Sequence, residues 1–305
     1  MKNVIRKLLA AAILISFSAS GAVTIADADK AHEKGDYLEV IKILTPLAVK
    51  GVAEAQFKLA VMYENGRGVK QDFAEALKWH KLAAEKGYVL AQYNYGLMHA
   101  TGRGVARDEA IAAKWWKLAA DQGSAMAQHN LAILYERGRG VIQDYDKAII
   151  LYKQAAEQGY VDSQNNLGLM YKNGRGVVKD YSEAVRWYKL AAEQGNIVAM
   201  SNLGAMYEQG QGVRQDYGMA AGLYRIAAEQ GVANAQINLG FMYAEGKGVK
   251  QDYVTASMWF NLAADQGVKL TSKELSDLAK VMTQEQVKKA RDLARECFAR
   301  KYQGC

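Results

Sequence analysis

The sequence predicts an all-α solenoid: a right-handed α-α superhelix of about six two-helix repeats, with a cap at each end. Seven glycines recur every 36 residues without an insertion, at Gly51, Gly87, Gly123, Gly159, Gly195, Gly231 and Gly267. Each interval holds a Gly-x-Gly pair and, four residues later, an aspartate, as in Gly66, Gly68 and Asp72. The chain has 1 proline and 28 glycines, which favours helices separated by glycine turns. A fixed period of this length is typical of stacked repeats that share one core.

Residues 1–22 have the pattern of a secretory signal peptide. Basic residues precede an apolar run over 8–17, and small residues follow up to Ala22. The run is too short to span a membrane, which takes about 20 apolar residues. We expect cleavage after Ala22, with Ser20 and Ala28 as alternative last residues of the leader, and therefore export with no integral membrane segment left. An uncleaved anchor is the alternative interpretation.

Residues 23–50 form a degenerate leading half-repeat in this interpretation. Asp36, Tyr37 and Gly51 stand in register with the later repeats, so 36–50 correspond to the second helix of a unit. The six complete repeats occupy 51–266.

Each repeat is expected to contain two helices. In the first repeat, helix one spans about 53–64 and ends at the Gly-Arg-Gly turn, because glycine adopts the positive φ that closes a helix. Helix two begins at Asp72, whose carboxylate can accept hydrogen bonds from the first-turn amides. Asp72 with Glu75, and Asp180 with Glu183, have the spacing of a capping box.

Apolar residues recur at helical spacing in every repeat and predict the core. Helix one repeats the positions of Ala55, Leu59 and Met62, and helix two repeats the position of Trp79, which Leu151 and Leu223 share. A column of small residues predicts close approach of neighbouring helices; its members are Ala60, Gly96, Ala132, Gly168, Gly204 and Gly240.

Residues 267–305 predict C-terminal capping helices. Thr283 and Gln286 have capping-box spacing, and the helix that follows keeps most of its basic residues on the face opposite its apolar stripe. A basic patch for acidic lipids or glycans is the alternative. Cys297 and Cys305 are the 2 cysteines of the chain, and in an oxidising compartment they can form a disulfide.

One stretch carries the repeat motif almost complete, with Tyr171, Gly174, Arg175, Gly176, Asp180, Tyr181, Trp187, Tyr188 and Gly195. This pattern resembles the Sel1-like repeat, a relative of the tetratricopeptide repeat, over 51–267. The resemblance implies an α-solenoid that serves as an adaptor for protein complexes, in bacteria often in the envelope. The second repeat departs most from the motif, with His99 in place of tyrosine.

Charge and composition argue against nucleic-acid binding and catalysis. The net charge of +7 comes from the two ends, whereas 23–266 carry equal numbers of acidic and basic residues, so no basic stripe for phosphates is present. The four histidines, His32, His80, His99 and His129, share no ligand spacing, and no cofactor motif occurs. Cysteine-rich relatives of this family are linked to β-lactam hydrolysis, but their cysteines are missing here. We expect no enzyme, no cofactor and no metal.

The free side of helix one predicts the binding surface. If the core positions pack, the 100° step per residue leaves the positions equivalent to 54, 57, 58, 61 and 64 on the concave face. In the first three repeats this set is unusually apolar and also includes asparagine; its members are Phe57, Val61, Leu90, Tyr93, Asn94, Leu97, Met126, His129, Asn130 and Ile133. The alternative is that position 61 is half-buried and that the asparagines only join adjacent repeats.

The sequence therefore predicts a periplasmic, non-catalytic scaffold that binds a protein or peptide partner through its concave face. Two alternatives stay open. One is a secreted or surface factor that binds a host or foreign protein, and the other is a wall-glycan-binding protein or hydrolase of the same repeat family.

Overall fold

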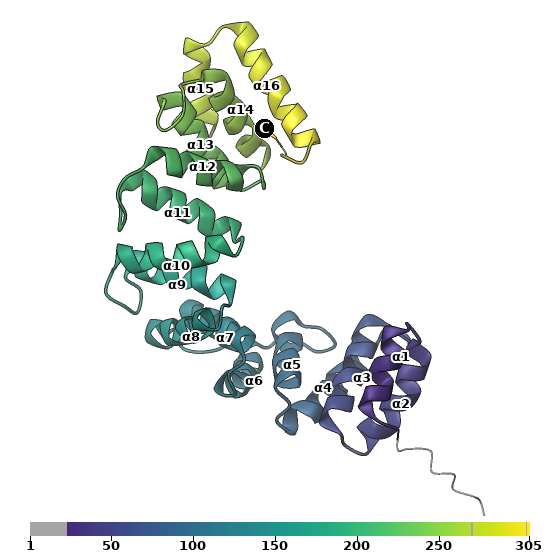
Figure 1. Cartoon of the computed structure of the whole chain (residues 1–305). Coiled ribbons are helices and arrows are strands. Elements are labelled where there is room, and N and C mark those ends of the chain that lie inside the picture. The colour runs from purple at the N-terminus through teal and green to yellow at the C-terminus, as the bar shows by residue number, and fades with distance from the viewer. Residues whose placement is uncertain (1–22, 270, 303) are drawn as a thin grey trace, which may run out of the picture. The chain divides into compact units, whose positions relative to one another are not determined.

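The computed structural model describes residues 23–269, 271–302 and 304–305, and all the regular secondary structure in them is helical. The predicted signal peptide, 1–22, lies outside the described residues. The chain divides into two compact units, one up to Arg107 and one from Asp108 to Cys305. We describe each unit by itself (Figure 1).

The first unit contains five helices in the described residues. They are α1 (Ile25–Glu33), α2 (Tyr37–Val49), α3 (Ala53–Asn65), α4 (Phe73–Glu85) and α5 (Val89–Thr101). Residues 23–50 thus hold a pair of packed helices, where the sequence indicated only a half-repeat. The sequence register reveals α2 but not α1, because α1 has 9 residues and a short turn instead of the 13 residues and long loop of α3.

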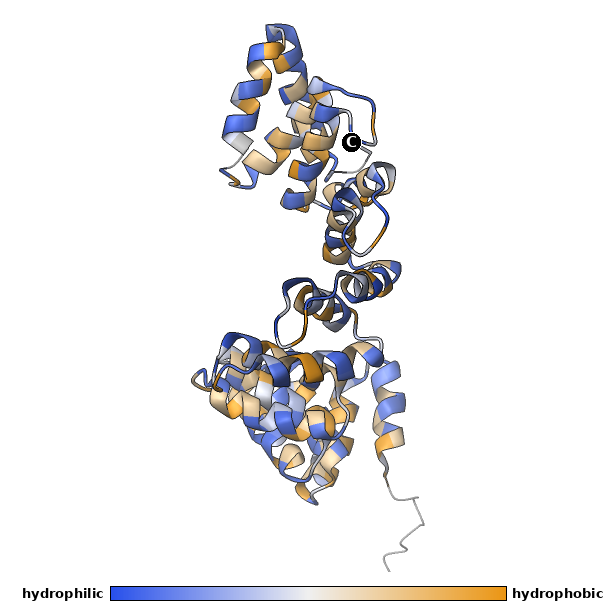
Figure 2. Cartoon of the chain, turned by 90° about the vertical axis from the view of Figure 1, so that its left-hand side faces the viewer, coloured by the Kyte–Doolittle hydropathy of each residue, from blue (hydrophilic) through white to orange (hydrophobic). Residues whose placement is uncertain are grey.

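The second unit contains eleven helices in the described residues. They are α6 (Glu109–Asp121), α7 (Ala125–Arg137), α8 (Tyr145–Glu157), α9 (Val161–Asn173), α10 (Tyr181–Glu193), α11 (Ile197–Gln209), α12 (Tyr217–Ala228), α13 (Ala233–Glu245), α14 (Tyr253–Asp265), α15 (Thr271–Val281) and α16 (Gln284–Ala299). Each helix from α7 to α14 packs on the next one, and α16 packs on α14. This arrangement confirms an all-α solenoid. Hydrophobic residues are distributed over the helices of both units (Figure 2), because no repeat buries its apolar face alone.

The two glycines of each turn are needed for different reasons. Gly174 ends α9 in the left-handed conformation, at φ 67°. Gly176 also has positive φ, at 63°, and in addition lies against the first residue of α8, so that a Cβ there would sit 2.6 Å from the Tyr145 carbonyl carbon. The turn thereby docks onto the second helix of the preceding repeat, which leaves no room for a side chain.

The small-residue column is confirmed as a site of close approach. A Cβ on Gly168 would lie 2.6 Å from Cε1 of Tyr188, and Gly204 and Gly240 face the rings of Tyr224 and Phe260 in the same way. In these repeats a buried ring on helix two therefore packs directly against the glycine of helix one.

The helix caps agree with the sequence in part. The Asp180 carboxylate accepts from the amides of Ser182 and Glu183 at 2.9 and 3.0 Å. The capping box predicted for Glu183 is not formed, because its carboxylate pairs with Arg186 at 2.9 Å. Glu75 likewise pairs with Lys78 at 3.0 Å. Both acids have a basic residue three positions later on the same helix face, and that residue competes for the carboxylate.

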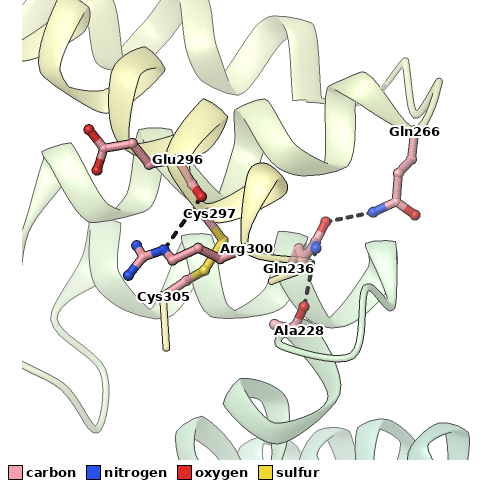
Figure 3. The surroundings of a disulfide bond; sticks show 7 residues. All are labelled: Ala228, Gln236, Gln266, Glu296, Cys297, Arg300 and Cys305. Carbon is pink, nitrogen blue, oxygen red and sulfur yellow. Dashed lines mark hydrogen bonds between the residues drawn. A yellow bond between two sulfur atoms is a disulfide. The ribbon is translucent and has the colours of Figure 1, made fainter. Parts of the chain in front are cut away.

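The C-terminal cap contains the disulfide that the sequence suggested. Cys297, fully buried on α16, is bonded to Cys305, with their Cα atoms 5.6 Å apart (Figure 3). The predicted Thr283–Gln286 capping box at the start of α16 is present. The returning tail places the Tyr302 ring against Gly231, so it covers the turn between α12 and α13.

Candidate functional site

The residues predicted for the concave face are divided between the two units. The first unit holds those from Phe57 to Leu97 and the second holds those from Met126 to Ile133. Two of the ten side chains are exposed, Leu90 at 41% and Met126 at 36%. Seven are half-buried, and one, His129, is buried. The predicted surface is therefore partly core.

In the first unit, Phe57 and Val61 line an apolar cleft of about 170 Å³. The cleft lies between α1, α2 and α3, and Leu44 and Met62 contribute to its walls. The helix α1 has 9 residues, whereas α3, the first helix of a complete repeat, has 13. Phe57 also contacts the next repeat, with ring centres 5.2 Å from Tyr88.

A charged rim borders this cleft. The Lys58 ammonium lies 2.5 Å from the Asp29 carboxylate and 3.5 Å from Glu54. Burial acts to lower the pKa of Lys58, but the two carboxylates outweigh burial and hold the pKa above its ordinary value. The charge of Lys58 is therefore already paired with Asp29 and Glu54.

In the second unit, His129 corrects the sequence interpretation. It is 7% exposed, its Nδ1 is 2.8 Å from Oγ of Ser163, and its ring packs 4.9 Å from that of Tyr160. Ser163 lies on α9, the first helix of the following repeat, and Tyr160 directly precedes that helix, so position 57 points into the junction between successive first helices. Asn165 and Ile237 are buried at the equivalent position. The sequence analysis missed this burial, because the spacing of residues along one helix does not show where the next helix lies.

The asparagine column joins repeats, as the alternative interpretation proposed. Asn202 donates to the side-chain oxygen of Asn165 at 2.9 Å. Asn166 hydrogen-bonds with the phenol of Tyr152, and Asn238 with that of Tyr224. These amides are used within the fold. The two asparagines that we named for binding, Asn94 and Asn130, are half-buried.

A buried glutamine network, which the sequence interpretation missed, connects successive repeats. Gln236 donates to the Ala228 carbonyl at 3.2 Å and accepts from Gln266 at 2.9 Å (Figure 3). Gln128 and Gln164 make the same pair of bonds. Glutamine recurring every 36 residues at two positions was the available signal. In the fifth repeat Met200 interrupts the network.

From the burial of His129 we expect the stability of the protein to depend on pH. Burial lowers the pKa of His129 below its ordinary 6.5, against a smaller opposite effect of Asp162. As the pH falls below 6.5, the unfolded chain takes up a proton that the folded chain does not, so stability falls. The loss is at most about 1.4 kcal/mol per pH unit.

His129→Asn tests this prediction, since asparagine occupies the equivalent position at Asn165. The free energy of unfolding, measured between pH 7 and 5 by urea titration, should depend less steeply on pH in His129→Asn than in the parent. Equal slopes for the two proteins would contradict the burial of a neutral imidazole.

Within the described part of the chain, no group of three or more His, Cys, Asp or Glu side chains is placed to hold a metal ion. The same residues include no helix long and apolar enough to cross a membrane.

Helix pairs in tandem, docked turns and a partly apolar first-helix face define an α-solenoid repeat protein. The chain belongs to the Sel1 repeat family, because six consecutive repeats match it, at 53–88, 89–124, 125–160, 161–196, 197–232 and 233–268. This confirms the resemblance seen in the sequence. Proteins of this family generally mediate protein–protein interaction, and such scaffolds are generally non-enzymatic.

Two solved structures are similar to the chain. One is c5321, described as a protective antigen present in uropathogenic Escherichia coli strains displaying an SLR fold, at 35% identity and TM-score 0.74. That match covers 86% of this chain but 56% of c5321, so the chain spans little more than half of that protein. The other is a Sel1 repeat protein from Oxalobacter formigenes, at 28% identity and TM-score 0.71, covering 80% of this chain and 97% of that one. A comparison with curated proteins finds no match.

Proposed function

We propose that this protein is a non-catalytic interaction scaffold of the bacterial cell envelope that binds a protein partner through the exposed positions of its first helices. The observation that carries the proposal is a set of exposed apolar side chains at one position of the second, third and fifth repeats, where the fourth repeat has Asp162. Leu90 is 41% exposed, Met126 36% and Val198 52%, all at the second residue of their first helices. Exposed apolar side chains that form a patch mark protein-interaction sites.

Burial and hydrogen bonding support a narrower binding surface than the one that the sequence predicts. Position 57 lies at the repeat junction, where His129 is buried, and the asparagine column is engaged in the fold. The positions equivalent to 54 and 61 remain available for binding. Leu90 and Met126 occupy the first of these and are exposed, and Leu97 and Ile133 occupy the second and are half-buried. Within the first unit we expect a partner to contact Leu90 and Leu97 more than Phe57. Within the second unit we expect it to contact Met126 and Ile133 more than His129.

The envelope location is supported by two features. One is the signal-peptide pattern of 1–22, and the other is the Cys297–Cys305 disulfide, because disulfides persist in oxidising compartments. Intact mass of the protein from a periplasmic extract tests this part; we expect a chain that begins at Val23. A chain retaining Met1 in the membrane fraction would contradict it.

A secreted or surface factor that binds a host protein is the second candidate. It is favoured by the similarity to c5321, which is described as a protective antigen. Protease accessibility on intact cells separates the two candidates, since only a surface-exposed chain is cleaved without opening the outer membrane.

Met126→Asp tests the binding surface. We expect the variant to reduce partner capture from an envelope extract about tenfold or more, because it places a charge in an apolar contact. Leu118→Asp is the matched control: Leu118 is 47% exposed and lies on α6, the second helix of its repeat. Both variants should melt within a few degrees of the parent. Equal capture by the two variants would contradict the first-helix surface.

A further inference from the structure

A polar ring on the second helix is paired with a glutamate in three repeats. The phenol of Tyr152 donates to Glu136 at 2.8 Å, and that of Tyr224 donates to Glu208 at 2.8 Å. In the first unit, Nε2 of His80 lies 3.3 Å from Glu64. In each case the acid lies 16 residues before the ring, at the end of the first helix. The sixth repeat, whose ring is Phe260, has Ala244 there instead. The acid thus accompanies tyrosine and histidine rings, whereas the second repeat, whose ring is Trp116, has Ala100 there.

Tyr188 breaks this rule. Its side chain is fully buried, and its hydroxyl makes no hydrogen bond with any described residue. The residue 16 positions earlier is Lys172, which cannot accept a hydrogen bond. The asparagine equivalent to those that bond Tyr152 and Tyr224 is Asn202, and it donates to Asn165 instead. A buried hydroxyl donor therefore has a lysine at the repeat position where the two neighbouring repeats hold a carboxylate.

The missing carboxylate can come from outside the chain. Glu136 reaches the buried phenol of Tyr152 from a side chain that is itself 23% exposed, so a carboxylate at the equivalent place in the fourth repeat has access to solvent. Lys172 is also partly exposed and forms no ion pair within the described residues. Burial raises the pKa of Tyr188, so its hydroxyl stays protonated and remains a donor.

We propose that a bound protein supplies this carboxylate, with an acidic side chain of the partner accepting a hydrogen bond from Tyr188 and pairing with Lys172. The inference rests on the proposed function, because it assigns a chemical preference to the first-helix side of the fourth repeat. A charge-assisted hydrogen bond of this kind is stronger than a neutral one and selects an acid over its amide.

Propionate is a direct probe, because it reproduces the end of a glutamate side chain. In full-length protein containing ¹³Cζ-labelled tyrosine, the Tyr188 signal, assigned by its loss in Tyr188→Phe, should move and saturate on addition of propionate. Propionamide at the same concentrations should not move it. The signals of Tyr152 and Tyr224 serve as internal controls, since Glu136 and Glu208 already occupy their hydroxyls.

Two variants of Lys172 complete the test. Lys172→Met should weaken the response to propionate about fivefold or more, because it removes the paired charge. Lys172→Glu should place an acceptor within the repeat, as Glu136 does. In this variant the Tyr188 signal should be shifted before propionate is added and should not move on its addition. The variant should also have a higher melting temperature than the parent. An unmoved Tyr188 signal in the parent, or equal responses in the parent and Lys172→Met, would overturn the proposal.

This result can be distinguished from a failure of the proposed function. If propionate has no effect on Tyr188 while Met126→Asp still abolishes partner capture, the binding surface stands and the acidic preference is wrong. If capture survives Met126→Asp while Lys172→Met reduces it, the acid subsite stands and the apolar surface is wrong.

Discussion

Gly176→Ala should lower the free energy of unfolding by about 3 kcal/mol. A non-glycine residue held at left-handed φ destabilises the folded state by about 1 to 2 kcal/mol. The φ of Gly176 is 63°. Crowding adds to this strain, because the new Cβ would lie 2.6 Å from the Tyr145 carbonyl carbon of the preceding repeat. The backbone cannot move away as a flexible side chain can, so the turn must separate from α8 to relieve the clash. We expect this to lower the free energy of unfolding by a further 1 to 3 kcal/mol, roughly.

Gly195→Ala separates strain from crowding. Gly195 has a φ of 84°, but a Cβ there would meet nothing within 4 Å. We expect this variant to lose only about 1 kcal/mol, the contribution of strain alone. Urea unfolding followed by circular dichroism measures both variants. Equal losses would show that the turn does not dock tightly on α8, and that the second glycine serves only the turn conformation.

Trp187→Ala should lower the free energy of unfolding by about 4 kcal/mol, as large-to-small changes in cores do. The side chain is 3% exposed and packs in one cluster with Leu167, Met170 and Tyr152. These residues come from three successive helices, α8, α9 and α10. The alanine variant would leave a cavity where two repeats meet, so the loss should also weaken the coupling between them.

Trp187→Leu is the matched control for this prediction. Leucine occupies the same position of the repeat at Leu151 and Leu223, so the backbone accommodates it. We expect a loss of less than about 2 kcal/mol, since most of the apolar contact remains. Urea midpoints for the two variants decide the question. Comparable losses would mean that the indole itself, and not the filled volume, holds the repeats together.

Several features were predictable from the sequence because they repeat. The period places a glycine at each helix end and an aspartate at each second-helix start, and the structure has both, as at Gly174 and Asp180. The core columns follow from the same spacing, with Leu59 and Trp187 buried as expected. Features without a periodic counterpart were missed. Helix α1 is out of register with the repeats, so the leading unit looked like half of one.

The binding surface was the least predictable part. The sequence analysis placed His129 on the exposed side of its helix. Helical spacing identifies the face that carries the apolar stripe, but it does not show which other positions a following helix covers. The structure buries it against Ser163 and Tyr160 of the next repeat. The angle at which repeats stack decides whether position 57 faces solvent or a neighbour, and that angle is a property of the assembled units.

The period, the turns, the aspartate caps of the second helices and the core columns could be predicted from the sequence, because these depend on local backbone conformation and on spacing along one helix. Only the tertiary structure decided which of the remaining positions are open, as for Met126, and which are closed, as for His129. The Tyr188 hydroxyl makes no hydrogen bond with any residue that the structure describes, whereas Glu136 and Glu208 accept from the equivalent tyrosines. Burial and hydrogen bonding within and between repeats join residues 16 to 37 positions apart, so they depend on how helices pack rather than on any one helix.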